Sequence, residues 1–320
     1  MRILITGGFG FIGGCLAKYL SDSGHQILLG SRFSASVPDW LPQAEVMQMN
    51  WDDGNALEES CNGIDVVIHA AGMNAQECAA DPVAALEFNG LATTRLLAAS
   101  ICAGVRRFIY ISTAHIYASP LVGEITEDSC PRNLHPYATS HLAGENALLS
   151  VNQKGQIEGI VLRLSNAFGA PMHRDVNCWT LLVNDLCRQA IETRKLILQT
   201  SGFQQRDFIG MTDFCRFVDC IVSYDGNENL PSVFNVGAGV SKSVLEMAEL
   251  IQKQCKLILG FEPTLQRATM GKDERHEQLS YHCDRLAKTG FCMALDDITE
   301  MNRLLLFCQS LFEQKKRSSL

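Results

Sequence analysis

"RILITGGFGFIGGCLAKYL", residues 2–20, joins a short apolar run to three spaced glycines and then to a helical pattern. The apolar run predicts a buried strand, and Gly7, Gly10 and Gly13 lie between it and a helix expected over 11–23. Glycine in such a turn lets backbone amides approach a pyrophosphate and lets the helix pack closely on the strand, while the helix N-terminus supplies partial positive charge. This context favours a dinucleotide site over a loop with a purely structural role.

Short apolar, β-branched runs recur after this segment, with helical patterns between them. Strands are expected at 2–6, 26–30, 45–49, 65–70, 107–112 and 159–164. Helices are expected at 11–23, 55–61, 83–103 and 136–152. This alternation is typical of a parallel sheet covered on both faces. The predicted fold class is therefore α/β, with a Rossmann-type doubly wound parallel sheet.

The alternation weakens after about residue 168, where Gly169 and Pro171 interrupt it. Helices are predicted at 179–192, 243–255 and 298–314, and a strand with a turn at 233–239. We interpret this part as a smaller, partly discontinuous C-terminal substrate lobe. The expected division is an NAD(P)-binding domain at 1–167, with a later returning segment near 205–240, and a mainly substrate-binding lobe at 168–320.

Composition argues against several kinds of partner. The chain has 320 residues, 47% of them apolar, and a formal net charge of −8, which suits neither nucleic acid nor an anionic membrane. No apolar run reaches the roughly 18 residues of a membrane span, and glycines interrupt the N-terminal run that would resemble a signal peptide. The 13 cysteines are scattered singly, without the spacing of a zinc site. We expect a cytoplasmic protein with free thiols and no metal.

The end of the second predicted strand indicates which dinucleotide is bound. A site for NAD carries an acidic residue there, which accepts hydrogen bonds from the adenosine ribose. This chain has Ser31 followed by Arg32. A guanidinium pairs with a 2′-phosphate and no carboxylate repels it, so NADP is preferred and NAD is the alternative. Arg32 could instead be an ordinary surface arginine that solvates the loop.

Further motifs follow the glycine turn in a fixed order. They are "NWDD" (50–53), "IHAAG" (68–72), "ISTAHIY" (111–117), "ITEDSCPRNLHPYATSHLAGE" (125–145), "LRLSNAFGAP" (162–171) and "QRDFIGMTDF" (205–214). With "TGGFGFIG" (6–13), they resemble the extended short-chain dehydrogenase/reductase family of NAD-dependent epimerase/dehydratase type. This branch holds nucleotide-sugar epimerases, dehydratases and reductases.

The resemblance implies a set of binding residues. Asn50 stands where the family has an aspartate beside the adenine, and Asn89 falls on the family's helix asparagine. The implied cofactor-binding residues are Gly7, Gly10, Phe11, Ile12, Gly13, Ser31, Arg32, Asn50, Trp51, Ala70, Ala71, Gly72, Asn89, Ser112, Tyr137, His141 and Leu164. Thr113, Asn166 and Arg206 would bind a nucleotide-sugar substrate. The resemblance also suggests a homodimer formed through helices that include the one carrying Tyr137.

The same resemblance assigns catalysis to Thr113, Tyr137 and His141. The family has lysine four residues after its tyrosine, where this chain has His141. A tyrosine with a pKa near 10 is a weak base at neutral pH unless a cation stabilises the phenolate. An imidazole is fully charged only below about pH 6.5, and burial lowers that limit. Tyr137 would therefore work with less assistance, for instance as a neutral phenol donating a proton during ketone reduction, or catalysis has been lost.

We predict an NAD(P)-dependent oxidoreductase-type enzyme for a nucleotide-linked sugar, a 4-keto reductase or epimerase that transfers hydride with Tyr137 as acid/base. The dehydratase branch has an Asp-Glu pair directly after its threonine, where this chain has Ala114 and His115, so dehydration is disfavoured. His115 is a candidate for a secondary role. The alternatives are a non-catalytic NAD(P)-binding sensor or scaffold and a reductase for a non-sugar ketone. Tyr137 and His141 could also be core side chains without chemical roles.

Overall fold

The structure, a computed structural model, describes residues 1–225, 230–269, 277–294 and 296–318. In these ranges a central sheet holds seven parallel strands. They are β1 (Arg2–Thr6), β2 (Gln26–Ser31), β3 (Glu45–Gln48), β4 (Val66–His69), β5 (Arg107–Thr113), β7 (Glu158–Leu164) and β11 (Val233–Val236). All seven lie where the sequence predicts strands, which confirms the α/β fold class.

The order of the strands across the sheet is β11-β7-β5-β4-β1-β2-β3. Because β1 pairs with both β2 and β4, the chain crosses the sheet in one direction from β1 to β3 and in the other direction from β4 onward. Doubly wound proteins bind ligands outside the carboxyl ends of the strands at such a reversal. The glycine turn follows β1 directly, so it lies at this position.

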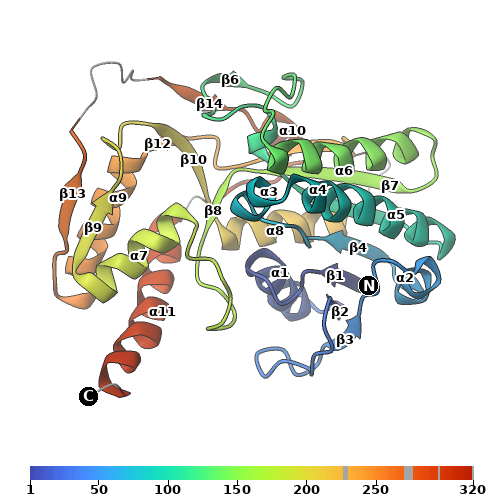
Figure 1. The fold of residues 1–320 in the computed structure, drawn as a ribbon, viewed down its shortest axis with the longest axis horizontal. Coiled ribbons are helices and arrows are strands. Elements are labelled where there is room, and N and C mark those ends of the chain that lie inside the picture. Colours follow the sequence, from blue (N-terminus) through green and yellow to red (C-terminus); the bar gives the residue numbers. More distant parts are fainter. Residues whose placement is uncertain (226–229, 270–276, 295, 319–320) are drawn as a thin grey trace.

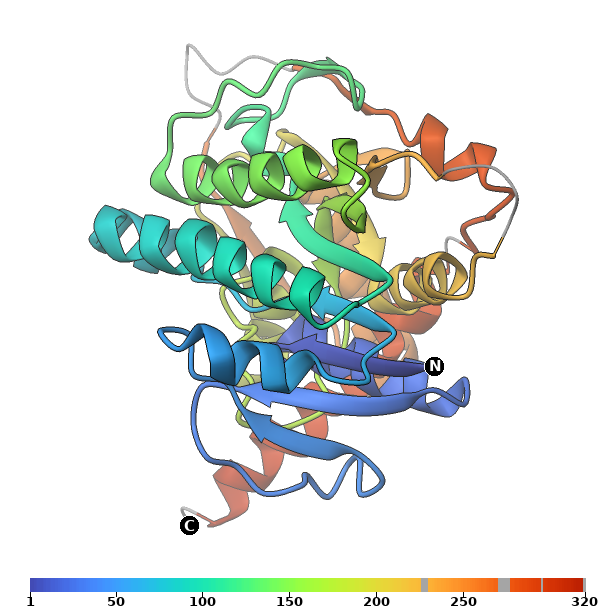
Figure 2. The same ribbon diagram turned by 90° about the vertical axis from the view of Figure 1, so that its right-hand side faces the viewer.

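Helices cover both faces of the sheet, as Figures 1 and 2 show. One face carries α1 (Phe11–Asp22) and α8 (Met211–Val222), and the other carries α2 (Gly54–Cys61), α5 (Thr93–Cys102) and α6 (Pro136–Gln153). Successive residues of a strand point to opposite faces. Ile3 and Ile5 therefore join the core under α1 and α8, while Leu4 joins the core under α2, α5 and α6.

The single helix predicted over 83–103 is divided in the structure. α4 (Pro82–Ala85) leads into a π-helical turn over Leu86–Ala92, and α5 follows it. The hydroxyls of Thr93 and Thr94 donate to the carbonyl oxygens of Asn89 and Gly90, at 2.7 Å and 2.9 Å. Hydroxyls that bond to carbonyls four residues back perturb a helix, and π-helical turns occur frequently at functional sites. This turn carries Asn89.

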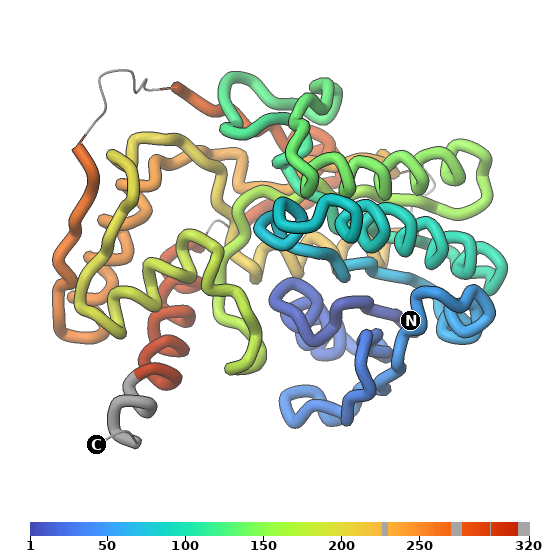
Figure 3. Tube along the Cα trace, in the orientation of Figure 1, coloured from blue at the N-terminus to red at the C-terminus, as the bar shows by residue number. Residues whose placement is uncertain are grey.

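A smaller lobe lies beside the sheet, and the tube in Figure 3 shows the chain entering it more than once. Its helices are α7 (Leu182–Thr193), α9 (Val244–Gln254) and α11 (Asp297–Ser318), and its paired strands are β9 (Lys195–Leu198) and β13 (Thr264–Arg267). Leu186, Met247 and Leu304 belong to a core of its own. Since β11 lies between α7 and α9 in the sequence but in the central sheet in space, the lobe is discontinuous. A domain boundary at 167/168 stays a prediction.

Short strands connect the two parts. β8 (Asn166–Phe168), β10 (Gln205–Gly210) and β12 (Ser241–Ser243) form one sheet, β6 (Gly123–Ile125) and β14 (Leu279–Tyr281) another, and α3 (Ala75–Ala80) and α10 (Asp284–Lys288) are short helices. The register pairs Phe208 with Asn166 and so brings Arg206 near the end of β7. Among the helices of the described residues, none is long and apolar enough to cross a membrane.

Candidate active site

The glycine turn has the geometry that a bound pyrophosphate needs. Gly7 has a φ of 67°, in the left-handed region, and its carbonyl oxygen accepts a hydrogen bond from the Gly10 amide at 2.8 Å. A Cβ atom on Gly13 would lie 2.3 Å from the Gly7 oxygen, and one on Gly7 would lie 2.9 Å from the Ala70 oxygen. Side chains at these positions would collide with the protein's own backbone, so glycine allows the turn, the helix and the loop after β4 to pack closely.

A cavity of about 280 Å³ adjoins this turn. It brings together many of the predicted cofactor residues: Gly7, Gly10, Ser31, Arg32, Trp51, Ala70, Ala71 and Gly72. The exposed Arg32 guanidinium lies 5.3 Å from the centre of the Phe88 ring and forms no ion pair with any described residue. The buried indole N–H of Trp51 likewise has no hydrogen-bond partner in the described part of the chain. The cradle and its unused donors fit a dinucleotide.

Two predicted cofactor residues contact the protein's own backbone. Asn89 is buried, accepts a hydrogen bond from the Met73 amide at 2.8 Å and donates one to the Ser140 hydroxyl at 3.0 Å. It therefore holds the loop after β4 against α6. Asn50 is exposed and accepts a hydrogen bond from the Asp52 amide at 3.4 Å. Contact of either residue with the cofactor stays a prediction.

A second cavity, of about 160 Å³, contains the predicted catalytic pair. Thr113 ends β5, and Tyr137 lies in the first turn of α6, where His135 Nδ1 caps the Tyr137 amide at 3.1 Å. Burial raises the pKa of Tyr137, and a hydrogen bond with the Thr113 side chain opposes that rise. The phenol is therefore protonated at neutral pH. Phe11, Ile12, Ser112 and Leu164, all predicted cofactor residues, line the same cavity.

His141 lies one helical turn after Tyr137. The two rings meet edge to face, with their centres 4.5 Å apart. His141 Nδ1 and the Tyr110 hydroxyl are hydrogen-bonded at 3.0 Å. Burial lowers the pKa of His141 to about 4, so the imidazole is uncharged at neutral pH. The phenol of Tyr137 thus has an aromatic neighbour at this position and not a cation.

Two of the predicted substrate residues, Asn166 and Arg206, lie on the paired strands β8 and β10. Asn166 lines the cavity of Thr113 and Tyr137 and donates its amide to the Asp207 carbonyl oxygen at 2.9 Å. The guanidinium of Arg206, on β10, forms no hydrogen bond or ion pair with any described residue, and burial lowers its pKa. His115 also lines the cavity. Burial is the main cause that lowers its pKa, and the positive charge of Arg206 lowers that pKa further. A half-buried guanidinium with no side-chain partner among the described residues favours binding of an anionic ligand here.

A buried ion pair behind Thr113 was not predicted. Glu145 and Arg163 lie 2.8 Å apart, and Ser112 donates its hydroxyl to Glu145. Arg163 also donates to the Tyr117 hydroxyl at 2.7 Å, and Tyr117 donates to Asn235 at 2.7 Å. These residues link β5, α6, β7 and β11. An arginine inside the apolar run at 159–164 was the signal that could have revealed the network.

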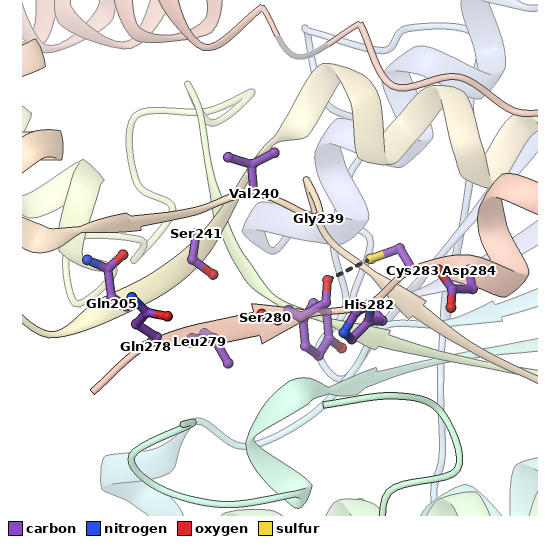
Figure 4. A pocket seen from close by; sticks show the side chains of 11 residues that line it. Gln205, Gly239, Val240, Ser241, Gln278, Leu279, Ser280, His282, Cys283 and Asp284 are labelled. Atoms are coloured by element: carbon purple, nitrogen blue, oxygen red, sulfur yellow. Dashed lines mark hydrogen bonds between the residues drawn. The ribbon is translucent and has the colours of Figure 1, made fainter. Parts of the chain in front are cut away.

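Figure 4 shows a larger cavity, of about 600 Å³. It is lined by Gln205 on β10, by the turn at 239–241 and by the segment 278–284. It shares no lining residue with the cavity of Thr113 and Tyr137. Of the residues predicted from the sequence, Thr113, Tyr137 and Asn166 line one of the two smaller cavities, and Ser31, Arg32 and Trp51 line the other. Neither of these cavities is lined by the predicted residues His141, Arg206, Asn89 and Asn50.

The doubly wound sheet with a glycine turn at its strand reversal defines a dinucleotide-binding protein. Residues 3–237 match the sequence model of the NAD dependent epimerase/dehydratase family. This match covers well over half of the chain, so the chain belongs to that family.

Several known proteins are similar to the chain. A dTDP-6-deoxy-L-talose 4-dehydrogenase (NAD(P)(+)) of Kitasatospora kifunensis is 28% identical over 262 residues, 78% of each sequence. The low-salt glycan biosynthesis protein Agl12 of Haloferax volcanii is 26% identical over 78% of this chain and 81% of its own. The structure of TunA, an NAD-dependent NDP-hexosamine 5,6-dehydratase, matches with a TM-score of 0.77 and 26% identity over 97% of this chain and 98% of its own.

Proposed function

We propose that this protein is an NAD(P)-dependent oxidoreductase-type enzyme for a nucleotide-linked sugar, acting as a 4-keto reductase or an epimerase. The observation that carries the proposal is that Thr113 and Tyr137 line one cavity next to the glycine turn. Family membership supports the general class of reaction. The similar dTDP-6-deoxy-L-talose 4-dehydrogenase acts, by its name, at position 4 of a nucleotide-linked sugar with NAD(P).

The glycine turn and the residues around Arg32 and Trp51 would hold the dinucleotide, which when bound donates or accepts a hydride. NADP is the preferred form in this proposal. In support, β2 ends at Ser31 without a carboxylate, and the Arg32 guanidinium is exposed beside the cavity and unpaired among the described residues. TunA, whose structure is similar, is an NAD-dependent enzyme, which keeps NAD as the alternative.

Tyr137 would act as the acid or base, and Thr113 would polarise the reacting oxygen. A protonated phenol next to an uncharged His141 is suited to give a proton to the oxygen of a ketone as the ketone is reduced. The reverse step needs a phenolate, and no cation among the described residues stabilises the phenolate of Tyr137. This difference favours the reductase over the epimerase, because an epimerase must run both directions on each turnover.

Arg206 and Asn166 would bind the nucleotide-linked part of the substrate. A guanidinium that is half-buried and unpaired among the described residues suits a diphosphate, and would be left without a partner by an uncharged, non-sugar ketone.

A homodimer is also proposed. Val83, Leu86 and Leu91, which are 67%, 51% and 48% exposed, lie close to α5 and α6 in the sequence or in space and would gain cover there. A mass of two chains in light scattering would support it.

The test is turnover of dTDP- and UDP-linked 4-keto sugars with NADPH and with NADH. Tyr137→Phe should lower turnover at least about a hundredfold and leave the affinity for NADPH nearly unchanged, because it removes only the transferable proton. Tyr19→Phe, a change of the same kind on α1, is the control and should behave as wild type. Unchanged turnover in Tyr137→Phe would remove Tyr137 from the mechanism.

The competing function is a non-catalytic NAD(P)-binding sensor or scaffold. The uncharged His141, in the place where the family has a lysine, is the observation that favours it. NADPH binding without turnover of any sugar in the panel would support this function over the enzymatic one.

A further inference from the structure

Tyr110, on β5, fills the space behind His141. Its side chain is 1% exposed, and its ring lies between those of His69 and His141, with centres 5.6 Å and 5.9 Å away. A Cβ atom on Gly144 would lie 2.8 Å from the Tyr110 hydroxyl oxygen. The helix α6 therefore passes close enough for the Tyr110 hydroxyl to reach His141 only because residue 144 has no side chain.

The hydrogen bonds around His69 fix its protonation. The Thr93 hydroxyl donates to the Asn89 carbonyl oxygen at 2.7 Å, so it accepts from His69 Nε2 at 2.9 Å. His69 Nδ1 then accepts from the Thr6 hydroxyl at 2.6 Å, and the Thr6 oxygen accepts from the Ala71 amide at 3.3 Å. Both ring nitrogens of His69 are therefore hydrogen-bonded to threonines. These bonds hold the ring in place against the stacked ring of Tyr110.

On the other face of the stack, the Tyr110 hydroxyl lies 3.0 Å from His141 Nδ1. Burial raises the pKa of Tyr110 well above its usual value, so the hydroxyl keeps its proton and is able to donate to His141 Nδ1. A neutral imidazole has a single N–H, and a nitrogen that accepts leaves that N–H on the other nitrogen. The Nε2 edge of His141 faces Gly72, where an added Cβ would lie 3.8 Å from Nε2. Gly72 lines the cavity beside the glycine turn.

We propose that Tyr110 is a positioning residue that holds His141 in the Nε2–H tautomer and directs that single N–H toward the bound dinucleotide. The ligand in this statement rests on the proposed function, whereas the tautomer does not. A lysine would offer three N–H donors and a charge, so its orientation matters little. An imidazole in the opposite tautomer would present only a lone pair to a ribose hydroxyl, and the hydrogen bond from the protein would be lost.

The experiment is a two-bond ¹H–¹⁵N spectrum of the full-length protein with ¹⁵N-labelled histidine, at neutral pH. The His141 signals are assigned by their loss in His141→Gln. Wild type should show the Nε2–H tautomer. Tyr110→Phe keeps the ring on His69 and removes the hydroxyl, so His141 should gain the Nδ1–H form, and the affinity for NADPH should fall about tenfold.

Tyr281→Phe is the matched control. Tyr281 is 2% exposed and its hydroxyl donates to the Arg163 carbonyl oxygen at 2.7 Å, outside the histidine stack. Its loss should leave the tautomer of His141 as in wild type. Should Tyr110→Phe fail to fold, Gly144→Ala, which displaces the Tyr110 hydroxyl, gives the same test.

Two results would overturn the inference: an Nδ1–H form of His141 in wild type, or an unchanged Nε2–H form in the Tyr110→Phe protein. Because the spectrum needs no substrate and no turnover, it is separate from the test of the proposed function. An inactive protein with the Nε2–H form refutes only the enzymatic role. An active protein with the Nδ1–H form refutes only the role of Tyr110.

Discussion

Two buried polar regions lie side by side between β5 and α6. Both place polar side chains in the interior, but only one of them contains charged groups. Ser112 and Glu145 belong to an ion-paired network, whereas Tyr110 and His141 belong to a neutral aromatic stack. The pairs are two residues apart on the strand and four apart on the helix, so they share a face of each element. The first region keeps its charges because each is paired, and the second avoids charge altogether.

The largest expected effect comes from removing a charge from the ion-paired network. Glu145→Gln leaves Arg163 buried without its partner and should cost about 3–5 kcal/mol of unfolding free energy, measured by urea denaturation. Glu45→Gln removes the same charge from a pair with Arg2 whose carboxylate is 63% exposed, and should cost less than about 1 kcal/mol. Equal costs in the two variants would contradict the difference between buried and exposed pairs.

Lowering the pH should destabilise the protein through protonation of His141, in the neutral aromatic stack. The pKa of His141 is lowered by burial from 6.5 to about 4, so the unfolded chain binds more protons than the folded chain between these values. The contribution of His141 to the free energy of unfolding is therefore fully present above about pH 6.5 and is lost as the pH falls toward 4. Between about pH 7 and about pH 4.5, wild type should lose about 2.5 kcal/mol more unfolding free energy than His141→Gln.

His282→Gln is the control for that measurement, because the contribution of His282 to stability changes with pH in the opposite direction. A hydrogen bond with Glu124 raises the pKa of His282, so its contribution is present at low pH and is lost as the pH rises. The side chain is 37% exposed, and the effect should be smaller than that of His141. Identical pH dependence in wild type and His141→Gln would mean that His141 is not held neutral by burial.

The smallest expected effect comes from returning a charge to the neutral stack. His141→Lys places an ammonium group near the Tyr137 phenol, which should favour the phenolate. The rate of alcohol oxidation should rise about tenfold and its pH profile should shift to lower pH, as measured by steady-state kinetics. Adding Tyr137→Phe should remove the gain. A flat response would show that residue 141 is not coupled to Tyr137.

Much of the fold could be predicted because its signals are local. The strands of the central sheet are apolar runs, and the glycine turn fixes where the first of them ends. Helix α8 was missed, since its segment was considered only for the motif around Arg206. The three-residue strands β6, β8 and β12 have no local signal, because each is held by a partner distant in the sequence. The π-helical turn depends on hydroxyl contacts that a periodic pattern does not show.

The site was predicted only in part. Motif spacing placed Thr113, Tyr137 and His141 in one region, and the structure brings them together. The partners of His141 were not predicted, because Tyr110 and Gly144 meet only when α6 packs on β5. Periodicity assigns a residue to a face of its element but does not give the neighbour on the facing element.

The place of β11 in the sheet has a consequence for synthesis of the chain. As the protein leaves the ribosome, β1 to β7 are available to pair before residues 233–236 have been made. Until then β7 is an edge strand with unpaired backbone groups, and Tyr117 lacks its bond to Asn235. The nascent first half is therefore open to wrong pairing at this edge, and the lobe segments that precede β11 must emerge before the sheet is closed.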